Sequence, residues 1–262
     1  MKTTTITSNS NDVKQQVSAE EWAMRVNLAA AYRLIATYGW DDLIFTHISA
    51  RVPGTEDEFL INPFGLMFDE VTASSLIKIN DKGEKVMQTP YPVNPAGFTI
   101  HSAVHQVRHD AGCVIHLHTV NGTAVSTDPR GLLPLNQTAL LVRDDVAYHD
   151  FEGVAVDLDE RPRLQKDLGD KNIMLLRNHG TLALGATVAE AFMRIYFIER
   201  ACEMQVATLS STGGTYYPTD ENVQEKVAEL GRDEEMAKQG ANMLAWPALL
   251  RRLDRIDTSY QD

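Results

Sequence analysis

The chain has 262 residues, of which 44% are hydrophobic and 23% charged, a composition that allows one domain with a substantial core. Its formal net charge of −12 is spread along the chain, which disfavours nucleic acid and anionic membranes as partners. No apolar segment near the N-terminus has the length of a signal or membrane anchor, so we expect a cytoplasmic protein. The two cysteines, Cys113 and Cys202, lie within apolar patterns and are expected to be free thiols.

The N-terminal part of the chain predicts a disordered segment and then a helix. Residues 1–17 are polar and show no hydrophobic periodicity, so we expect them to be disordered. Ser18 and Glu21 have the spacing of a capping box, which indicates that a helix begins there. Gly39 follows the helical pattern and is a natural stop for it.

A β-rich region and a second helix come next. Residues 44–52 and 59–61 carry strand-type side chains, and residues 77–86 predict a hairpin. Residues 98–108 are expected to form a helix, which the strand 113–118 follows directly. These short strands predict a mainly antiparallel sheet.

The second half of the sequence predicts several short elements before one long helix. The short elements are helices from Val120, near 137–142 and over 163–168, and strands over 146–148, 172–176 and 181–184. Thr187 and Glu190 form another capping box, and an apolar spine over 188–209 predicts a helix that covers the sheet. We therefore expect one domain over 18–214 and a peripheral C-terminal helical arm over 215–262.

Three histidines form a candidate metal site. His116 and His118 alternate with apolar residues on a predicted strand, and this two-residue period places both imidazoles on one face. His179 stands between a buried strand and Gly180, where the backbone can turn tightly. Three imidazoles and an open position are typical of a catalytic zinc centre. An H-x-H on a strand also occurs where histidines only hydrogen-bond, and other third ligands stay open on chemistry alone: His149, His101 and His105.

Five blocks of the sequence resemble a known family. They are PAGFTIHS at 95–102, VIHLHT at 114–119, GLLPL at 131–135, VAYHDFEG at 146–153 and LLRNHG at 175–180. In this order they resemble the class II aldolase family, and specifically its adducin-head branch. The resemblance covers roughly residues 20–215.

The resemblance implies a fold, an assembly and a metal. The fold is α/β, with three α/β/α layers around a largely antiparallel central sheet, and relatives commonly form homotetramers with active sites at subunit contacts. The metal-binding positions of the family fall on His116, His118 and His179. They imply one divalent ion, with zinc expected first and manganese, cobalt or iron as alternatives, since imidazole accepts all of them.

The sequence departs from the sugar-phosphate aldolases of this family at two sets of positions. Their proton-transferring glutamate falls on Gly97 here. Their phosphate-binding side chains fall on His47, Phe64, Pro95 and Ala96. Since Phe64 and Pro95 offer no side-chain donor, a phosphate would lose charge-assisted hydrogen bonds, each normally worth on the order of a kcal/mol or more. A phosphorylated sugar is therefore not the expected substrate.

Three residues are candidates to replace the missing base. His101 lies one helical turn beyond Gly97, and Tyr148 and His149 lie together in the Tyr-His-Asp sequence. Each also has an ordinary structural interpretation, as part of a loop hydrogen-bond network or as a polar residue on a half-buried helix.

Two hypotheses of function follow. The first is a metal-dependent lyase that acts on a small unphosphorylated hydroxy-carbonyl compound, by aldol cleavage or decarboxylation. The second is a catalytically silent, adducin-like assembly module of the kind associated with the actin cytoskeleton. The lyase predicts a small-molecule substrate and bound metal, and the module predicts protein contacts without turnover, with or without the ion.

Overall fold

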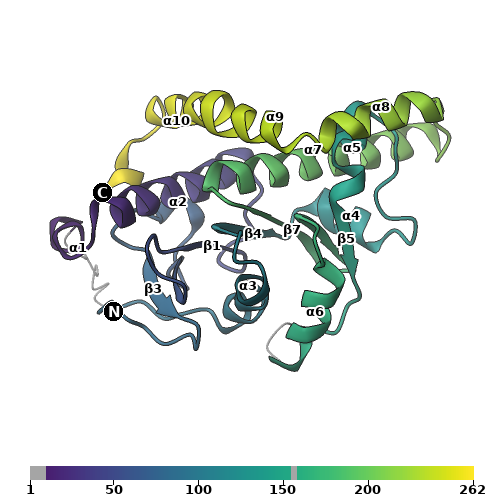
Figure 1. Ribbon diagram of the computed structural model, residues 1–262. Helices are drawn as coiled ribbons and strands as arrows, with labels where there is room; N and C mark the ends of the chain where they lie inside the picture. Colours follow the sequence, from purple (N-terminus) through teal and green to yellow (C-terminus); the bar gives the residue numbers. More distant parts are fainter. Residues whose placement is uncertain (1–9, 155–157) are drawn as a thin grey trace, which may run out of the picture.

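The computed structural model describes residues 10–154 and 158–262 (Figure 1). In this part of the chain, one sheet has seven strands in the order β3-β2-β1-β4-β7-β6-β5. The strands are β1 (His47–Arg51), β2 (Glu58–Ile61), β3 (Ile77–Asn80), β4 (Cys113–Leu117), β5 (Val146–His149), β6 (Ile173–Leu176) and β7 (Gly180–Gly185). Every neighbouring pair is antiparallel except β5 and β6, which are parallel. The predicted, largely antiparallel sheet is confirmed.

Helices cover both faces of the sheet (Figure 1). The α-helices are α1 (Ser10–Gln16), α2 (Ala19–Tyr38), α3 (Pro95–Val107), α4 (Val120–Thr127), α5 (Gln137–Val142), α6 (Arg161–Leu168), α7 (Val188–Thr212), α8 (Glu221–Gly231), α9 (Glu234–Gln239) and α10 (Trp246–Asp254). Short 3-10 turns lie at η1 (Phe68–Glu70), η2 (Arg143–Asp145), η3 (Leu158–Glu160) and η5 (Ser259–Gln261), and η4 (Gly240–Ala245) is a π-helical turn. α2 and α7 pack on one face, and α3 and α6 on the other.

The two faces of β4 show how this arrangement positions the site. Cys113, Ile115 and Leu117 belong to the apolar core under α2 and α7. Val114 belongs to the smaller core under α3 and α6. Because side chains alternate along a strand, His116 lies on the α3 side of the sheet.

Local capping explains where the two longest helices begin and end. The Ser18 side chain accepts a hydrogen bond from the Glu21 amide at 3.1 Å, and Gly39 ends α2 in the left-handed region with φ 67°. Thr187 likewise accepts from the Glu190 amide at 3.1 Å. The reciprocal half of the first capping box is not formed, because the Glu21 carboxylate instead pairs with two cations, Arg25 and Lys78.

Two expectations for the ends of the chain need correction. Residues 10–16, expected to be disordered, form α1, and Lys14 lies over the Trp22 ring at 5.3 Å; residues 1–9 are outside the described part. The arm after residue 214 is helical as expected but not peripheral. Four of its side chains are buried in the main core, and they are Ala241, Trp246, Leu253 and Tyr260.

Two further expectations concern the cysteines and the membrane. Cys113 and Cys202 are buried free thiols, as predicted. Among residues 10–154 and 158–262, no helix combines the length and apolar character that crossing a bilayer requires.

Candidate metal centre

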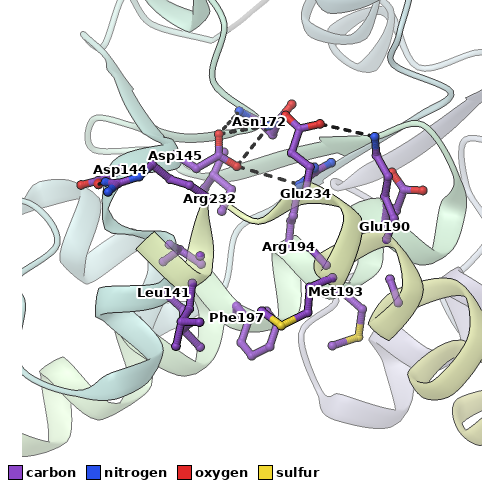
Figure 2. Close-up of a pocket in the computed structure, with 18 of the residues that line it drawn as sticks. Leu141, Asp144, Asp145, Asn172, Glu190, Met193, Arg194, Phe197, Arg232 and Glu234 are labelled. Carbon is purple, nitrogen blue, oxygen red and sulfur yellow. Dashed lines mark hydrogen bonds and ion pairs between the residues drawn. The ribbon is translucent and has the colours of Figure 1, made fainter. Parts of the chain in front are cut away.

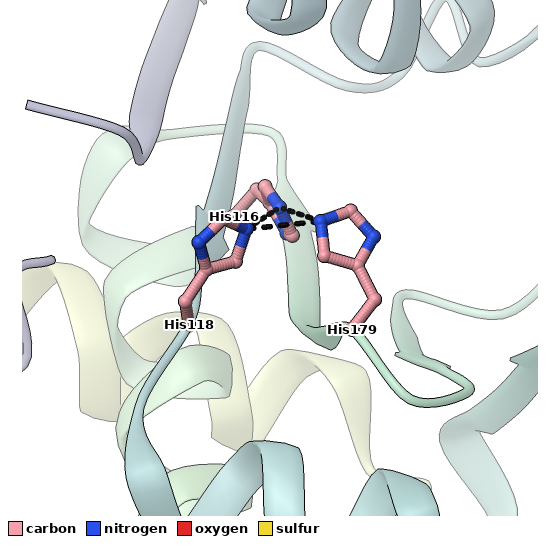
Figure 3. Close-up of side chains that lie close together, drawn as sticks. All are labelled: His116, His118 and His179. Carbon is pink, nitrogen blue, oxygen red and sulfur yellow. Dashed lines mark hydrogen bonds between the residues drawn. The ribbon is translucent and has the colours of Figure 1, made fainter. Parts of the chain in front are cut away.

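Three imidazoles meet at one end of the central strands β4 and β7 (Figure 3). His116 lies on β4, His118 directly follows this strand, and His179 lies in the turn between β6 and β7. The Nε2 atom of His118 is 2.9 Å from that of His116 and 2.9 Å from that of His179. The Nε2 atoms of His116 and His179 are 3.2 Å apart. The three predicted residues therefore share one point in space.

The turn between β6 and β7 brings the distant histidine to the other two. Asn178 adopts a left-handed conformation with φ 56°, which reverses the chain just before His179. Gly180 then passes so close to β4 that an added Cβ would lie 2.2 Å from the Leu117 carbonyl oxygen. Only glycine permits this approach, which sets His179 beside His118.

Hydrogen bonds at Nδ1 orient two of the three rings. The Nδ1 atom of His116 lies 2.9 Å from the Thr181 carbonyl oxygen, and that of His118 lies 3.1 Å from the Asp42 carboxylate. Both partners are acceptors, so each Nδ1 donates, and in a neutral ring this leaves the lone pair on Nε2. A carbonyl or carboxylate behind a histidine is the usual arrangement at metal ligands.

Burial keeps two of these imidazoles, His116 and His179, neutral. Desolvation and the neighbouring histidines lower the pKa of His116 well below its ordinary value and that of His179 to about 4. Neutral imidazoles are the form that binds metal. Tetrahedral zinc with bonds of about 2.0–2.1 Å needs nitrogens roughly 3.3 Å apart, close to the spacing here. The donor set therefore fits a divalent ion.

We refer to His116, His118 and His179 as the triad. A series of buried polar residues runs from the triad into the α3 side of the sheet. His47 pairs directly opposite His116 in the β1–β4 ladder, with ring centroids 5.1 Å apart. Its Nδ1 lies 2.8 Å from Nε2 of His101. Ser49 Oγ in turn contacts Nδ1 of His101 at 2.5 Å and Nε2 of His105 at 2.8 Å. We refer to these four residues as the imidazole chain.

His47 also explains why position 97 carries no side chain. A Cβ added at Gly97 would lie 2.9 Å from Cδ2 and 3.0 Å from Cγ of His47. The imidazole therefore fills the space in which a side chain at position 97 would begin. From the sequence, His47 is expected only at a phosphate-binding position, because the pairing of β1 with β4 depends on residues distant in sequence.

The other two candidate bases lie in structural contacts. The Tyr148 hydroxyl accepts from the Leu132 amide at 3.1 Å, and its ring lies 4.4 Å from the Arg177 guanidinium. His149 is buried, with Nδ1 2.7 Å from Asp167 and Nε2 3.3 Å from Glu160. Both ring nitrogens of His149 are thus engaged by carboxylates. Of the three candidates, His101 is the one that hydrogen-bonds to His47, whose ring packs against His116.

A separate cavity of about 570 Å³ lies between α5, α7, α8 and α9 (Figure 2). Its floor is apolar, with Leu141, Met193 and Phe197, and none of the triad residues lines it. The charged groups at its rim are paired with one another, such as Arg194 with Asp145. This cavity is therefore separate from the candidate metal centre.

The fold and the site together define a class of protein. It is an α/β protein in which three imidazoles converge at one end of the central strands. The family model described as Class II Aldolase and Adducin N-terminal domain matches residues 26–206. The chain belongs to this family, and the predicted family and fold are confirmed.

Several relatives match along nearly the whole chain. A protein of Pseudomonas aeruginosa, named provisionally as an aldolase class 2 protein, is 53% identical over 95% of this chain and 96% of its own length. The crystal structure of an aldolase II superfamily protein from Pseudomonas syringae has a TM-score of 0.88 at 46% identity, covering 95% of this chain and 99% of that one. An L-fuculose 1-phosphate aldolase from Glaciozyma antarctica has a TM-score of 0.80 at 27% identity, covering 93% and 94%.

Adducins match a smaller part of their own length. Mouse alpha-adducin is 50% identical over 74% of this chain, but the matched region is only 27% of that protein. The similarity to adducins therefore concerns one of their domains.

Proposed function

We propose that this protein is a metal-dependent lyase that breaks a carbon–carbon bond in a small unphosphorylated hydroxy-carbonyl compound, by aldol cleavage or decarboxylation. The convergence of the Nε2 atoms of His116, His118 and His179 carries this proposal. Zinc suits these three donors and an open position, with manganese, cobalt or iron as alternatives. Such an ion would act as a Lewis acid on the substrate oxygens.

The imidazole chain is the group best placed to handle the proton of this reaction. His47 is its member beside the triad, and the hydrogen bond to His101 leaves Nε2 of His47 for the substrate. A proton taken up there can pass through Nδ1 to His101. Burial lowers the pKa of both rings well below the ordinary value, so they are weak bases. We therefore expect slower turnover than a glutamate at position 97 would give.

The same residues support an unphosphorylated substrate. At the positions where sugar-phosphate aldolases bind phosphate, His47 keeps its Nδ1 on His101 and offers only the lone pair of Nε2, and Phe64 presents an aromatic side chain. Without charge-assisted donors, a phosphate dianion would be desolvated without compensation.

Exposed apolar side chains around the triad support a homo-oligomer, with a tetramer expected from the family. Phe45, Val120 and Phe151 are between 51% and 84% exposed. Val120 lies two residues after His118, and the ring centroids of Phe151 and His179 are 6.4 Å apart. Exposed apolar groups gathered around a site are typical of a subunit contact.

Metal analysis of the purified protein tests the proposal. We expect about one equivalent of divalent metal per chain, lost in His116→Ala and kept in His109→Ala, which removes an exposed histidine instead. Chelator should abolish turnover in a panel of hydroxy-aldehydes and hydroxy-acids, and zinc should restore it. Wild-type protein without metal, or His116→Ala with unchanged metal, would contradict the proposal.

The similarity to adducins favours a second candidate, a catalytically silent assembly module. It predicts no turnover with any member of the panel, whether or not metal is bound. Chelator-sensitive turnover would therefore exclude it.

A further inference from the structure

A buried carboxyl group lies behind the candidate metal centre and has no part in the proposed reaction. Glu199 on α7 is fully buried. Within the described residues, no ion pair reaches it, and its carboxylate oxygens accept hydrogen bonds from two hydroxyl groups. Burial raises the pKa of this carboxyl to about 7, despite these two hydrogen bonds. Burying a carboxyl without a cation costs more free energy than burying an apolar side chain of similar size. Its presence here therefore indicates a specific role.

The two hydroxyl groups belong to the segments that carry the metal-binding candidates. Oε2 of Glu199 accepts from Thr119, the residue that directly follows His118. Oε1 accepts from Thr181 on β7, two residues after His179. One carboxyl group therefore joins the end of β4 to the start of β7.

Each threonine also has a direct structural link to the site. Thr181 offers its carbonyl oxygen to Nδ1 of His116 at 2.9 Å, which fixes the orientation of that ring. Thr119 accepts from the Gly122 amide at 2.9 Å and so caps α4, the helix that begins after His118. A displacement of either threonine would therefore move a histidine.

The packing around Glu199 leaves little freedom. A Cβ added at Gly122 would lie 2.7 Å from Thr119 Oγ1 and 3.0 Å from Glu199 Oε1, so α4 approaches the carboxyl as closely as glycine allows. From the same helix, Thr123 donates to the His179 carbonyl oxygen at 3.1 Å. Hydroxyl groups thus tie the segments that carry His118 and His179 to α4 and α7.

We infer that Glu199 is a positioning residue, which sets the metal affinity of the triad by holding Thr119 and Thr181 in place. This inference rests on the proposed metal centre. Groups that orient metal ligands from behind typically change metal affinity by about 10–100-fold when they are removed. Glu199 acts here through two threonines, without touching the ion.

Metal affinity of the full chain, measured with Zn²⁺ against a chromophoric chelator, tests the inference. Glu199→Gln keeps one acceptor oxygen and Glu199→Leu keeps none, so we expect a loss of affinity that is smaller for Gln and about 10–100-fold for Leu. The visible spectrum of the Co²⁺-loaded protein should change in the same order, since it reports the coordination geometry. Thr181→Val removes one of the two hydroxyl donors and should lie between wild type and Glu199→Leu.

Glu203→Gln is the matched control. Glu203 lies one turn further along α7 and bonds Trp40 and Arg200, away from the triad. Its substitution should leave Zn²⁺ affinity unchanged. If Glu199→Leu does not fold, the comparison of Glu199→Gln and Thr181→Val with Glu203→Gln decides the matter.

Two outcomes overturn the inference, and they are distinguishable from each other. If wild type binds Zn²⁺ and the Glu199 and Thr181 variants bind it within twofold as tightly, or if Glu203→Gln loses as much, the positioning role is wrong and the metal centre stands. If wild type binds no Zn²⁺, the proposed function and this inference both fail.

Discussion

At the residue scale, histidine protonation connects the site with the stability of the fold. His101 and His105 are buried, and desolvation lowers the pKa of His101 well below its ordinary value and that of His105 to about 3. In the unfolded chain both rings bind a proton below about pH 6.5. The stability that these two neutral histidines contribute is therefore complete above pH 6.5 and is lost as the pH falls toward 3.

This difference predicts the pH dependence of unfolding. Each such histidine should lower the free energy of unfolding by about 1.4 kcal/mol for every pH unit below 6.5. Glu199 has the opposite sign, because its raised pKa of about 7 stabilises the fold only while the carboxyl is protonated. One carboxyl opposes several imidazoles, so denaturant unfolding of metal-free protein should show lower stability at pH 5 than at pH 7. Equal stability at the two values would contradict the burial of neutral imidazoles.

A variant of one histidine isolates its share of this effect. His105→Leu removes one titrating group. The free energy of unfolding should therefore depend less steeply on pH between 6.5 and 5, by the equivalent of about one proton. His109→Leu, at an exposed position, should leave the slope unchanged.

The relative placement of residues could be predicted from the sequence where it follows a local pattern. The two-residue period of a strand places His116 and His118 on one face without knowledge of the fold. His47 could not be assigned to the site in this way, because its place opposite His116 depends on strands more than 60 residues apart in sequence. Asp42 and Glu199 likewise reach the site only through tertiary packing.

At the element scale, the contact between β1 and α3 decides which side chain can stand next to the triad. The His47 ring on β1 fills the space beside Gly97 in the first turn of α3. A larger residue at either position excludes the other. One packing arrangement therefore accounts for both features. The imidazole at position 47 occupies the space that a glutamate at position 97 would need.

A double-mutant cycle tests this steric coupling. Gly97→Ala alone should destabilise the protein by about 1–3 kcal/mol, since its Cβ would overlap the His47 ring. In the background of His47→Ala the same change should be neutral or stabilising, as alanine is usually preferred over glycine in a helix. Gly240→Ala, where nothing lies within 4 Å of the added Cβ, is the control. Additive effects of the two changes would contradict the coupling.

Element boundaries were predicted best where local signals exist. The caps at Ser18 and Thr187 and the glycine stop at Gly39 lie where the sequence places them. The predicted hairpin after β3 is reduced to a single bridge between Ile79 and Lys85, because no regular strand follows the turn. The order of strands in the sheet depends on contacts distant in sequence and was not predictable from local patterns.

At the scale of the whole molecule, the C-terminal helices complete the main core. Trp246 is 6% exposed, packs 5.5 Å from the Phe192 ring and donates to Asn27 at 2.7 Å. The arm therefore ties α7 to α2. This role could not be predicted from the average composition of the arm, which is polar, because only a few of its side chains are buried in the core.

Truncation of this anchor measures how far the arm contributes to stability. Trp246→Ala should lower the free energy of unfolding by about 3–5 kcal/mol, as expected for a buried tryptophan. Met243→Ala, in the neighbouring turn and 73% exposed in wild type, should change it by less than about 0.5 kcal/mol. A small effect of Trp246→Ala in denaturant unfolding would show that the arm is peripheral after all.

Anomalous diffraction at the zinc absorption edge, from crystals grown with zinc, tests the metal centre most directly. We predict one strong peak about 2.0–2.1 Å from the Nε2 atoms of His116, His118 and His179. No peak at this point, or a zinc ion held instead between His149 and its carboxylate partners, would contradict it.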